Sequence, residues 1–429
     1  MRKLKYAKNG RLLFTKEMKK EYTILCPMML PIHLKFLEKI MNKFGYKMEL
    51  LDTTHPQIVN EGLQNVHNDT CYPALLVIGQ LLDAVKSGKY DRNKLALIIT
   101  QTGGGCRASN YIYLLRKALK KNDMEDIPVV SFNLNFMEKN PGFKITLSML
   151  IQFVYAVLYG DILMLLANQT RPYEINKGDA DKLTEKWITQ LSEELSARSI
   201  LNNRKFKKNM EQIAAEFAAI PVVKVDKLKV GIVGEIYVKY SPLGNNNLEE
   251  FLQQEGAEIE VPGLMDFIIY STDNGATDNK LYGSKKIVSI YTNLLTRYMV
   301  KMQKMLIDAV KTQDCFKAPA SFDHIKSLTE GYIGTGTKMG EGWLLTAEML
   351  ELVNSGVENI VCTQPFGCLP NHISGKGMIR KIKKNHPNAN IVAIDYDPGA
   401  TRINQENRIK LMLSVAKLNS FQKTANCEV

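Results

Sequence analysis

The sequence lacks the closely spaced cysteines that form disulfide frameworks or zinc knuckles. Its seven cysteines are scattered over 429 residues, and no two of them form a CxxC pair. A secreted scaffold held together by disulfides is therefore not expected. The basic N-terminal stretch MRKLKYAKNGRLLFTKEMKKEY also lacks an apolar core. We therefore expect no signal peptide and a cytoplasmic protein.

No RNP, helix-turn-helix or zinc-finger pattern accompanies the positive charge. The net charge is +12, and many of the lysines lie in expected helices such as RKALKKND and RKIKKNH. Without a recognition motif, no nucleic-acid partner is expected. The charge is compatible with a solvated basic surface or with a polyanionic small ligand such as a coenzyme A ester.

The glycine-rich stretch GTGTKMGEGW lacks the GxxxxGK[ST] signature, and no strand directly precedes it. It predicts a close backbone approach to a ligand, or a simple loop. Neither a nucleotide nor a flavin is expected in this chain. The apolar segment Ile145–Ala167 is long enough to span a bilayer but carries Gln152, Gly160 and Asp161 near its middle. A buried helix is favoured, with no membrane partner.

Apolar runs alternate with segments of helical spacing over much of the chain, which predicts an α/β protein with parallel sheets. Strands are expected at Tyr22–Cys26, Met48–Asp52, Lys94–Thr100, Ile127–Leu134, Lys229–Val238, Ala257–Leu264, Val357–Cys362 and Asn390–Asp397. The expected domains are an N-terminal α/β domain over 1–142, a helical connector over 143–221 and a C-terminal α/β domain over 222–429. Ligands of such folds gather at the carboxyl ends of the strands.

Three cysteines directly precede expected helices. Cys71 lies in HNDTCYPALLVIG, Cys106 in TQTGGGCRASNYI and Cys368 in VCTQPFGCLPNHISGKG. A helix N-terminus lowers the pKa of a thiol, and the thiolate is the form that binds metal. If the two α/β halves face each other, the three could bind an iron–sulfur cluster with a non-cysteine fourth ligand. Three unrelated structural thiols are the alternative.

Three further residues are candidates for the site. Cys362 would be an additional cluster ligand or a small buried hydrophobic residue. Glu235, near the end of an expected strand, would be a catalytic acid or base, a ligand, or a helix cap. His372 would donate a hydrogen bond to a substrate carbonyl or cap its own helix.

The cysteine motifs, together with GDILMLLANQTRPYE, VGIVGEIYVKYSP and IDYDPGATRINQENRIKLML, resemble the 2-hydroxyacyl-CoA dehydratase superfamily. The chain looks most like the branch described as related to acyl-CoA dehydratase activases, and the resemblance runs from about Tyr22 to Ala416. It implies two flavodoxin-like domains with a helical part. It also implies a 4Fe–4S cluster between the domains, bound by Cys71, Cys106 and Cys368.

The resemblance further implies an oxygen-sensitive hydro-lyase. In this superfamily an ATP-hydrolysing activase supplies one electron of very low potential, and water leaves a 2-hydroxyacyl-CoA thioester by a ketyl-radical route. No ATP-binding half precedes Tyr22, so a separate activase is expected. The superfamily's dehydratases pair two different subunits, and the expected partners therefore include a second homologous subunit or another copy of the chain.

Two alternatives remain open at this point. A related group carries a double-cubane 8Fe–9S cluster and reduces small molecules with ATP-driven electrons, and Cys362 near Cys368 is compatible with that group. The other alternative is a non-catalytic electron-transfer or accessory subunit that holds a cluster.

Overall fold

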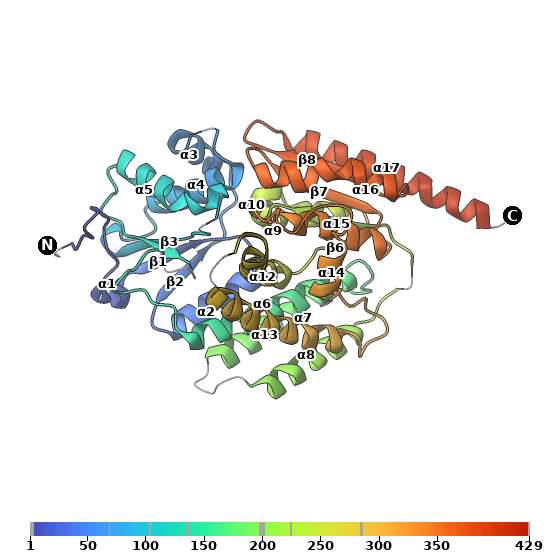
Figure 1. Ribbon diagram of the computed structural model, residues 1–429, viewed down its shortest axis with the longest axis horizontal. Coiled ribbons are helices and arrows are strands. Elements are labelled where there is room, and N and C mark those ends of the chain that lie inside the picture. The colour runs from blue at the N-terminus through green and yellow to red at the C-terminus, as the bar shows by residue number, and fades with distance from the viewer. Residues whose placement is uncertain are drawn as a thin grey trace.

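The computed structural model describes residues 4–67, 69–102, 104–133, 137–196, 202–223, 225–283 and 286–427. Two parallel sheets of four strands each lie over a layer of helices (Figure 1). The N-terminal sheet has the order β2-β1-β3-β4 and the C-terminal sheet the order β6-β5-β7-β8. Their strands are β1 Thr23–Pro27, β2 Lys47–Leu51, β3 Leu95–Thr100, β4 Val129–Phe132, β5 Lys229–Gly234, β6 Glu258–Glu260, β7 Asn359–Pro365 and β8 Asn390–Tyr396. The predicted α/β class and the parallel pairing are confirmed.

The two sheets share one plan, because the second strand of each lies outside the first and the third and fourth follow on the other side. The strands are continuous apolar runs. In β3, for example, the first five of six residues are buried. This pattern is typical of parallel strands that are covered on both faces.

The helices of the N-terminal half are α1 Lys16–Glu21, α2 Pro31–Lys43, α3 Gln57–Asn65, α4 Tyr72–Lys86 and α5 Tyr111–Lys121. Those that follow are α6 Leu147–Thr170, α7 Asp179–Ser196, α8 Asn203–Ala218, α9 Ile236–Tyr240, α10 Pro242–Asn245, α11 Leu248–Gln254, α12 Leu264–Tyr282 and α13 Lys286–Val310. The C-terminal ones are α14 Phe322–Ser327, α15 Trp343–Asn354, α16 Ile379–Asn385 and α17 Arg402–Cys427.

The helical layer is built around α6, which packs against α2, α7, α8, α12 and α13. Its hydrophobic core includes Trp187 and Trp343, both fully buried. The layer therefore combines α6 to α8 with helices from the chain beyond residue 221. The predicted domain boundaries fall in the loop between β4 and α6 and in the loop between α8 and β5.

Helix α6 contains the apolar segment that could span a bilayer, but 61% of its most apolar window is buried inside the protein. The carboxylate of Asp161 in this helix accepts hydrogen bonds from the backbone N–H groups of Leu264 and Met265, at 2.7 and 2.9 Å. It also lies 2.9 Å from His33 Nε2. Asp161 thus satisfies the first turn of α12, and α6 is packed as a core helix, as predicted.

Candidate functional site

The loops that carry Cys71 and Cys368 touch each other between the two α/β halves. The backbone N–H of Tyr72 donates to the carbonyl of Phe366 at 3.0 Å. Gly367 has a positive φ of 73°, and a Cβ there would lie 3.1 Å from the Cα of Cys71. Only glycine suits this conformation and this close approach. One hydrophobic core continues from α4 into the C-terminal sheet, so the contact is firmly supported.

The glycine-rich loop brings Cys106 to the same place. A Cβ on Gly340 would lie 4.0 Å from Cys106 Sγ and 3.1 Å from the side chain of Pro370, which follows Cys368. The three sulfurs lie near enough that a negative charge on Cys71 would raise the pKa of Cys106, and one on Cys106 would raise the pKa of Cys368. The structure therefore brings together the three cysteines that the motifs singled out. The glycine-rich loop packs against two of their segments, and its predicted approach to a ligand stays a prediction.

Each of the three cysteines precedes a helical segment, as predicted. Cys71 is the N-cap of α4, and Cys106 is the N-cap of the 3₁₀ helix Arg107–Ser109. The carbonyl of Cys368 accepts from the backbone N–H of His372 at 3.1 Å, at the start of a segment that continues as a π-helix. One detail differs, because α3 separates β2 from Cys71. The Cys71 loop therefore joins two helices, not a strand and a helix.

The expectation that these thiols have low pKa values is wrong. Burial raises the pKa of the Cys106 thiol to about 11, and it also raises the pKa values of Cys71 and Cys368. Backbone N–H groups in the first helical turns do act in the lowering direction on all three thiols, as a helix N-terminus should. Desolvation outweighs them, because the thiols lie between packed domains.

Two carboxylates lie beside the thiols. Glu235 is the N-cap of α9, and its Oε2 accepts from the backbone N–H of Val238 at 2.9 Å. Glu341 Oε1 accepts from the backbone N–H of Ile236, also at 2.9 Å. Burial raises the pKa of Glu235 to about 8, and the charge of Glu341 acts in the same direction. Glu235 thus has the capping role proposed for it and also lies close enough to the cysteines to interact with their charge.

Two residues of this site were not among the predicted ones. Glu341 lies between Gly340 and Gly342, whose φ values are +59° and +46°. An acidic residue between two glycines was the available signal, since this backbone holds the carboxylate in a tight loop. Tyr111, five residues after Cys106, places its hydroxyl 2.8 Å from Cys71 Sγ. Its position in the motif TQTGGGCRASNYI gave no indication of that contact.

His372 and Cys362 have surroundings of different kinds. The His372 side chain is exposed, and within the described residues it has no hydrogen-bond partner. Cys362 is fully buried in the hydrophobic core of the C-terminal sheet, with Asn371 Oδ1 3.7 Å from its sulfur. Any functional role for either residue stays a prediction.

Three cysteine thiols and two carboxylates are the possible metal ligands at this site. In the described ranges, no group of three His, Cys, Asp or Glu side chains is arranged around one ion. A cluster's own iron and sulfide atoms lie between its ligands, so the thiols that hold it are spaced more widely. Cysteine thiolates are the ligands that iron–sulfur clusters use. Cys71 and Cys368 are buried, and Cys106 is partly exposed. The carboxylates of Glu235 and Glu341 are oxygen donors in the same place.

No protein-family model matches the chain, and no curated protein matches it in sequence. The functional interpretation therefore depends on the geometry of this site and on the motifs that carry the resemblance.

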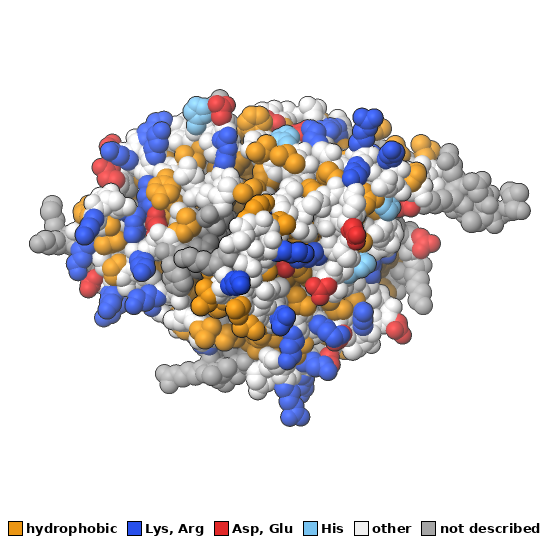
Figure 2. Space-filling model, in the orientation of Figure 1, with side chains coloured by type: hydrophobic (Ala, Val, Ile, Leu, Met, Phe, Trp, Pro, Cys, Tyr) orange, Lys and Arg blue, Asp and Glu red, His pale blue; other side chains and the backbone are white. Residues whose placement is uncertain are grey.

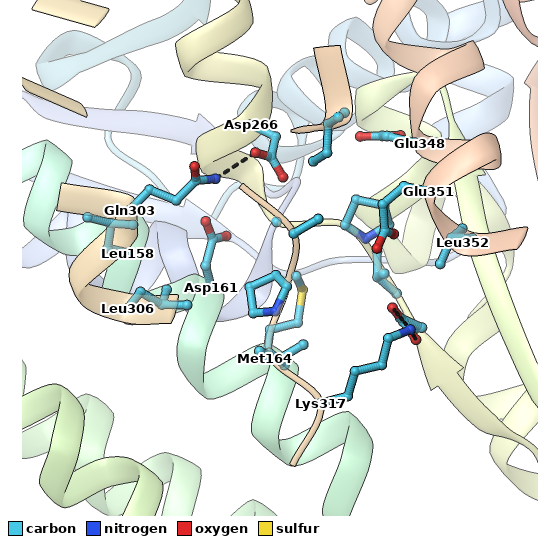
Figure 3. A pocket seen from close by; sticks show the side chains of 18 residues that line it. Leu158, Asp161, Met164, Asp266, Gln303, Leu306, Lys317, Glu348, Glu351 and Leu352 are labelled. Atoms are coloured by element: carbon cyan, nitrogen blue, oxygen red, sulfur yellow. Dashed lines mark hydrogen bonds and ion pairs between the residues drawn. The ribbon is translucent and has the colours of Figure 1, made fainter. Parts of the chain in front are cut away.

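A separate cavity of about 50 Å³, lined by both apolar and charged side chains, lies among α6, α12 and α15 (Figure 3). Within it, Gln303 Nε2 donates to Asp266 Oδ1 at 2.6 Å, and burial raises the pKa of Asp266 to about 8. Glu348 also lines it and is paired with Lys239. Small-molecule sites usually have volumes of about 300 Å³ or more, so this cavity is too small for a coenzyme A ester.

We predict that Glu235→Gln changes how stability depends on pH. A carboxyl group whose pKa is higher in the folded protein than in the unfolded chain stabilises the fold at low pH. That contribution is complete below the unfolded pKa of 4.5 and is lost as the pH rises towards 8. The variant should therefore lose less stability than the wild type between pH 5 and 8. The difference should be about 2 kcal/mol, which allows for screening by solvent at this partly exposed residue.

Urea unfolding at several pH values measures this difference. The glutamine retains an oxygen that can accept from Val238, so the cap is preserved. Glu330→Gln, at an exposed glutamate, is the matched control and should follow the wild type. Equal pH dependence in Glu235→Gln and the wild type would show that the carboxyl of Glu235 is not desolvated.

Proposed function

We propose that this chain is an iron–sulfur enzyme of the 2-hydroxyacyl-CoA dehydratase type. The observation that carries the proposal is the meeting of Cys71, Cys106 and Cys368, which come from two α/β halves. They lie in three of the motifs that carry the resemblance to that superfamily. These three side chains would hold a 4Fe–4S cluster, which supplies one electron at low potential when it is bound.

The strand order supports two flavodoxin-like domains. Each sheet has the order 2-1-3-4, which matches the first four strands of the flavodoxin-like order. Ligands of such sheets bind where the strand order reverses, between the first and third strands. In the C-terminal sheet these strands are β5 and β7, followed by Glu235 and Cys368. In the N-terminal sheet, β3 leads towards Cys106.

The carboxylates supply a proton at the site. A hydroxyl group leaves a substrate more easily when it is protonated, which requires a nearby acid. Burial and the nearby charge of Glu341 raise the pKa of Glu235, which favours the protonated form of its carboxyl. Glu341 lies close by and disfavours a second negative charge. We propose that Glu235 and Glu341 hold the proton that is transferred to the departing hydroxyl group.

The surface near Cys368 is suited to an apolar group. Phe366, Leu369 and Ile373 have exposed fractions of 49%, 68% and 54%. Figure 2 shows groups of hydrophobic side chains on the face of the molecule in view, with lysines and arginines around them. An acyl chain with an anionic coenzyme A group combines these two chemistries. The proposed partners are this thioester and a separate ATP-dependent activase, in a cytoplasmic setting.

Iron and acid-labile sulfide, measured on protein purified without oxygen, test the proposal together with an electron paramagnetic resonance spectrum. About four iron atoms per chain support a single cubane, and about eight support the double-cubane alternative. Protein without iron, from a host competent to build clusters, would overturn the proposal. Loaded protein is then assayed with activase, ATP, reductant and 2-hydroxyacyl-CoA thioesters. A cluster that cycles without any turnover would favour an accessory subunit.

A further inference from the structure

The side chain of Tyr111, which lies in the same motif as Cys106, contacts the sulfur of Cys71. Tyr111 begins α5, its side chain is buried, and its hydroxyl lies 2.8 Å from Cys71 Sγ. Cys106 and Tyr111 belong to the same short segment. The contact therefore links the segment that carries Cys106 to Cys71, the N-cap residue of α4.

The chemistry of a bound cluster decides which atom donates this hydrogen bond. In the metal-free thiol, either the sulfur or the hydroxyl can be the donor. A cysteine that binds iron is a thiolate and has no hydrogen to donate. A phenol keeps its proton at neutral pH, since its ordinary pKa is about 10. With a cluster in place, Tyr111 is therefore the donor and Cys71 the acceptor.

The interaction is specific to one of the three cysteines. Within the described residues, no side chain donates a hydrogen bond to the sulfur of Cys106 or Cys368. The surroundings of all three thiols are otherwise similar, because burial raises each of their pKa values. Removing the Tyr111 hydroxyl would thus change the environment of one ligand and leave the others intact.

We propose that Tyr111 tunes the reduction potential of the cluster by donating a hydrogen bond to the Cys71 thiolate. This inference rests on the proposed function. The reduced cluster carries one more negative charge than the oxidised one. A donor directed at a ligand sulfur stabilises the reduced form more and raises the potential. Tyr111 is a positioning residue, because it acts through Cys71 and not on a substrate.

Tyr111→Phe tests the inference, because it removes the hydroxyl and keeps the buried ring. Tyr113→Phe is the matched control, since Tyr113 lies on the same helix with 53% of its surface exposed. Iron and sulfide contents are measured first. Midpoint potentials are then determined by redox titrations followed by electron paramagnetic resonance. We expect unchanged iron, a more negative potential in Tyr111→Phe and the wild-type potential in Tyr113→Phe.

The outcomes separate this inference from the proposed function. An unchanged potential in iron-loaded Tyr111→Phe would overturn the tuning role alone. Loss of iron from this variant would also overturn it, by showing that the hydroxyl is needed to hold Cys71 in place. Wild-type protein without iron would overturn both proposals. A shifted potential in a protein that turns over no thioester would support the tuning role and count against the dehydratase activity.

Discussion

Replacing Cys71, Cys106 or Cys368 with serine is expected to remove nearly all of the cluster iron. A serine hydroxyl does not readily give the anionic ligand that iron–sulfur clusters require, so each substitution removes one proposed ligand. Each single variant should fall from about four iron atoms per chain to almost none when it is purified without oxygen. Cys315→Ser is the matched control, because Cys315 is exposed, and it should keep its full iron content.

Circular dichroism and urea unfolding establish that the iron-free variants are folded. A variant that is folded and retains its iron would refute the assignment of its cysteine as a ligand.

The variant Cys362→Ser tests whether Cys362 is a cluster ligand or a residue of the hydrophobic core. This thiol is fully buried among apolar side chains, so the change should cost about 1–3 kcal/mol of stability and leave the iron content unchanged. Folded Cys362→Ser protein that lost iron would instead favour the double-cubane alternative.

Sequence patterns were most informative where one physical effect dominated. The apolar runs predicted the positions of the eight strands in the described residues, because strands covered on both faces must be apolar along their length. The strand expected over Lys229–Val238 was too long, since β5 ends at Gly234 and Ile236–Tyr240 forms helix α9. The helix after Cys71 was predicted from Pro73 in its first turn and from Gly88 near its end. Helix α12 was missed because its apolar and polar residues do not separate clearly onto two faces. In the structure, the carboxylate of Asp161 caps this helix from α6, a contact between distant parts of the chain.

The sequence predicted that the three cysteines precede helical segments, but it did not predict the electrostatics of the site. The positions of the cysteines before helices follow from local sequence, whereas their pKa values depend on packing between halves that are far apart in the chain. Local helix effects therefore favoured low pKa values, while burial raises them. Glu341 was missed for the same reason. Its importance comes from its contact with Ile236, which is about a hundred residues away.

Removing one partner of the buried ion pair between Lys239 and Glu348 should give the largest loss of stability among the variants near the site. The Lys239 ammonium lies 2.9 and 3.2 Å from the two carboxylate oxygens, and the two side chains are only 3% and 2% exposed. Lys239→Met would leave the Glu348 carboxylate buried without its partner. We expect a loss of about 3–5 kcal/mol in the free energy of unfolding at neutral pH, measured with urea.

Two further variants identify the cause of this loss. Lys304→Met breaks an exposed pair with Asp308 and should cost less than about 1 kcal/mol. The double variant Lys239→Met/Glu348→Leu removes both charges and should recover most of the stability. The loss in Lys239→Met should also shrink at low pH, because the isolated Glu348 can then bind a proton. A loss no larger than that of Lys304→Met would contradict this account.

Helix α9 begins beside Glu235, and α15 follows Glu341. The pair therefore joins the two elements that place both carboxylates beside the cysteines, so Lys239→Met should weaken iron binding even where the chain remains folded.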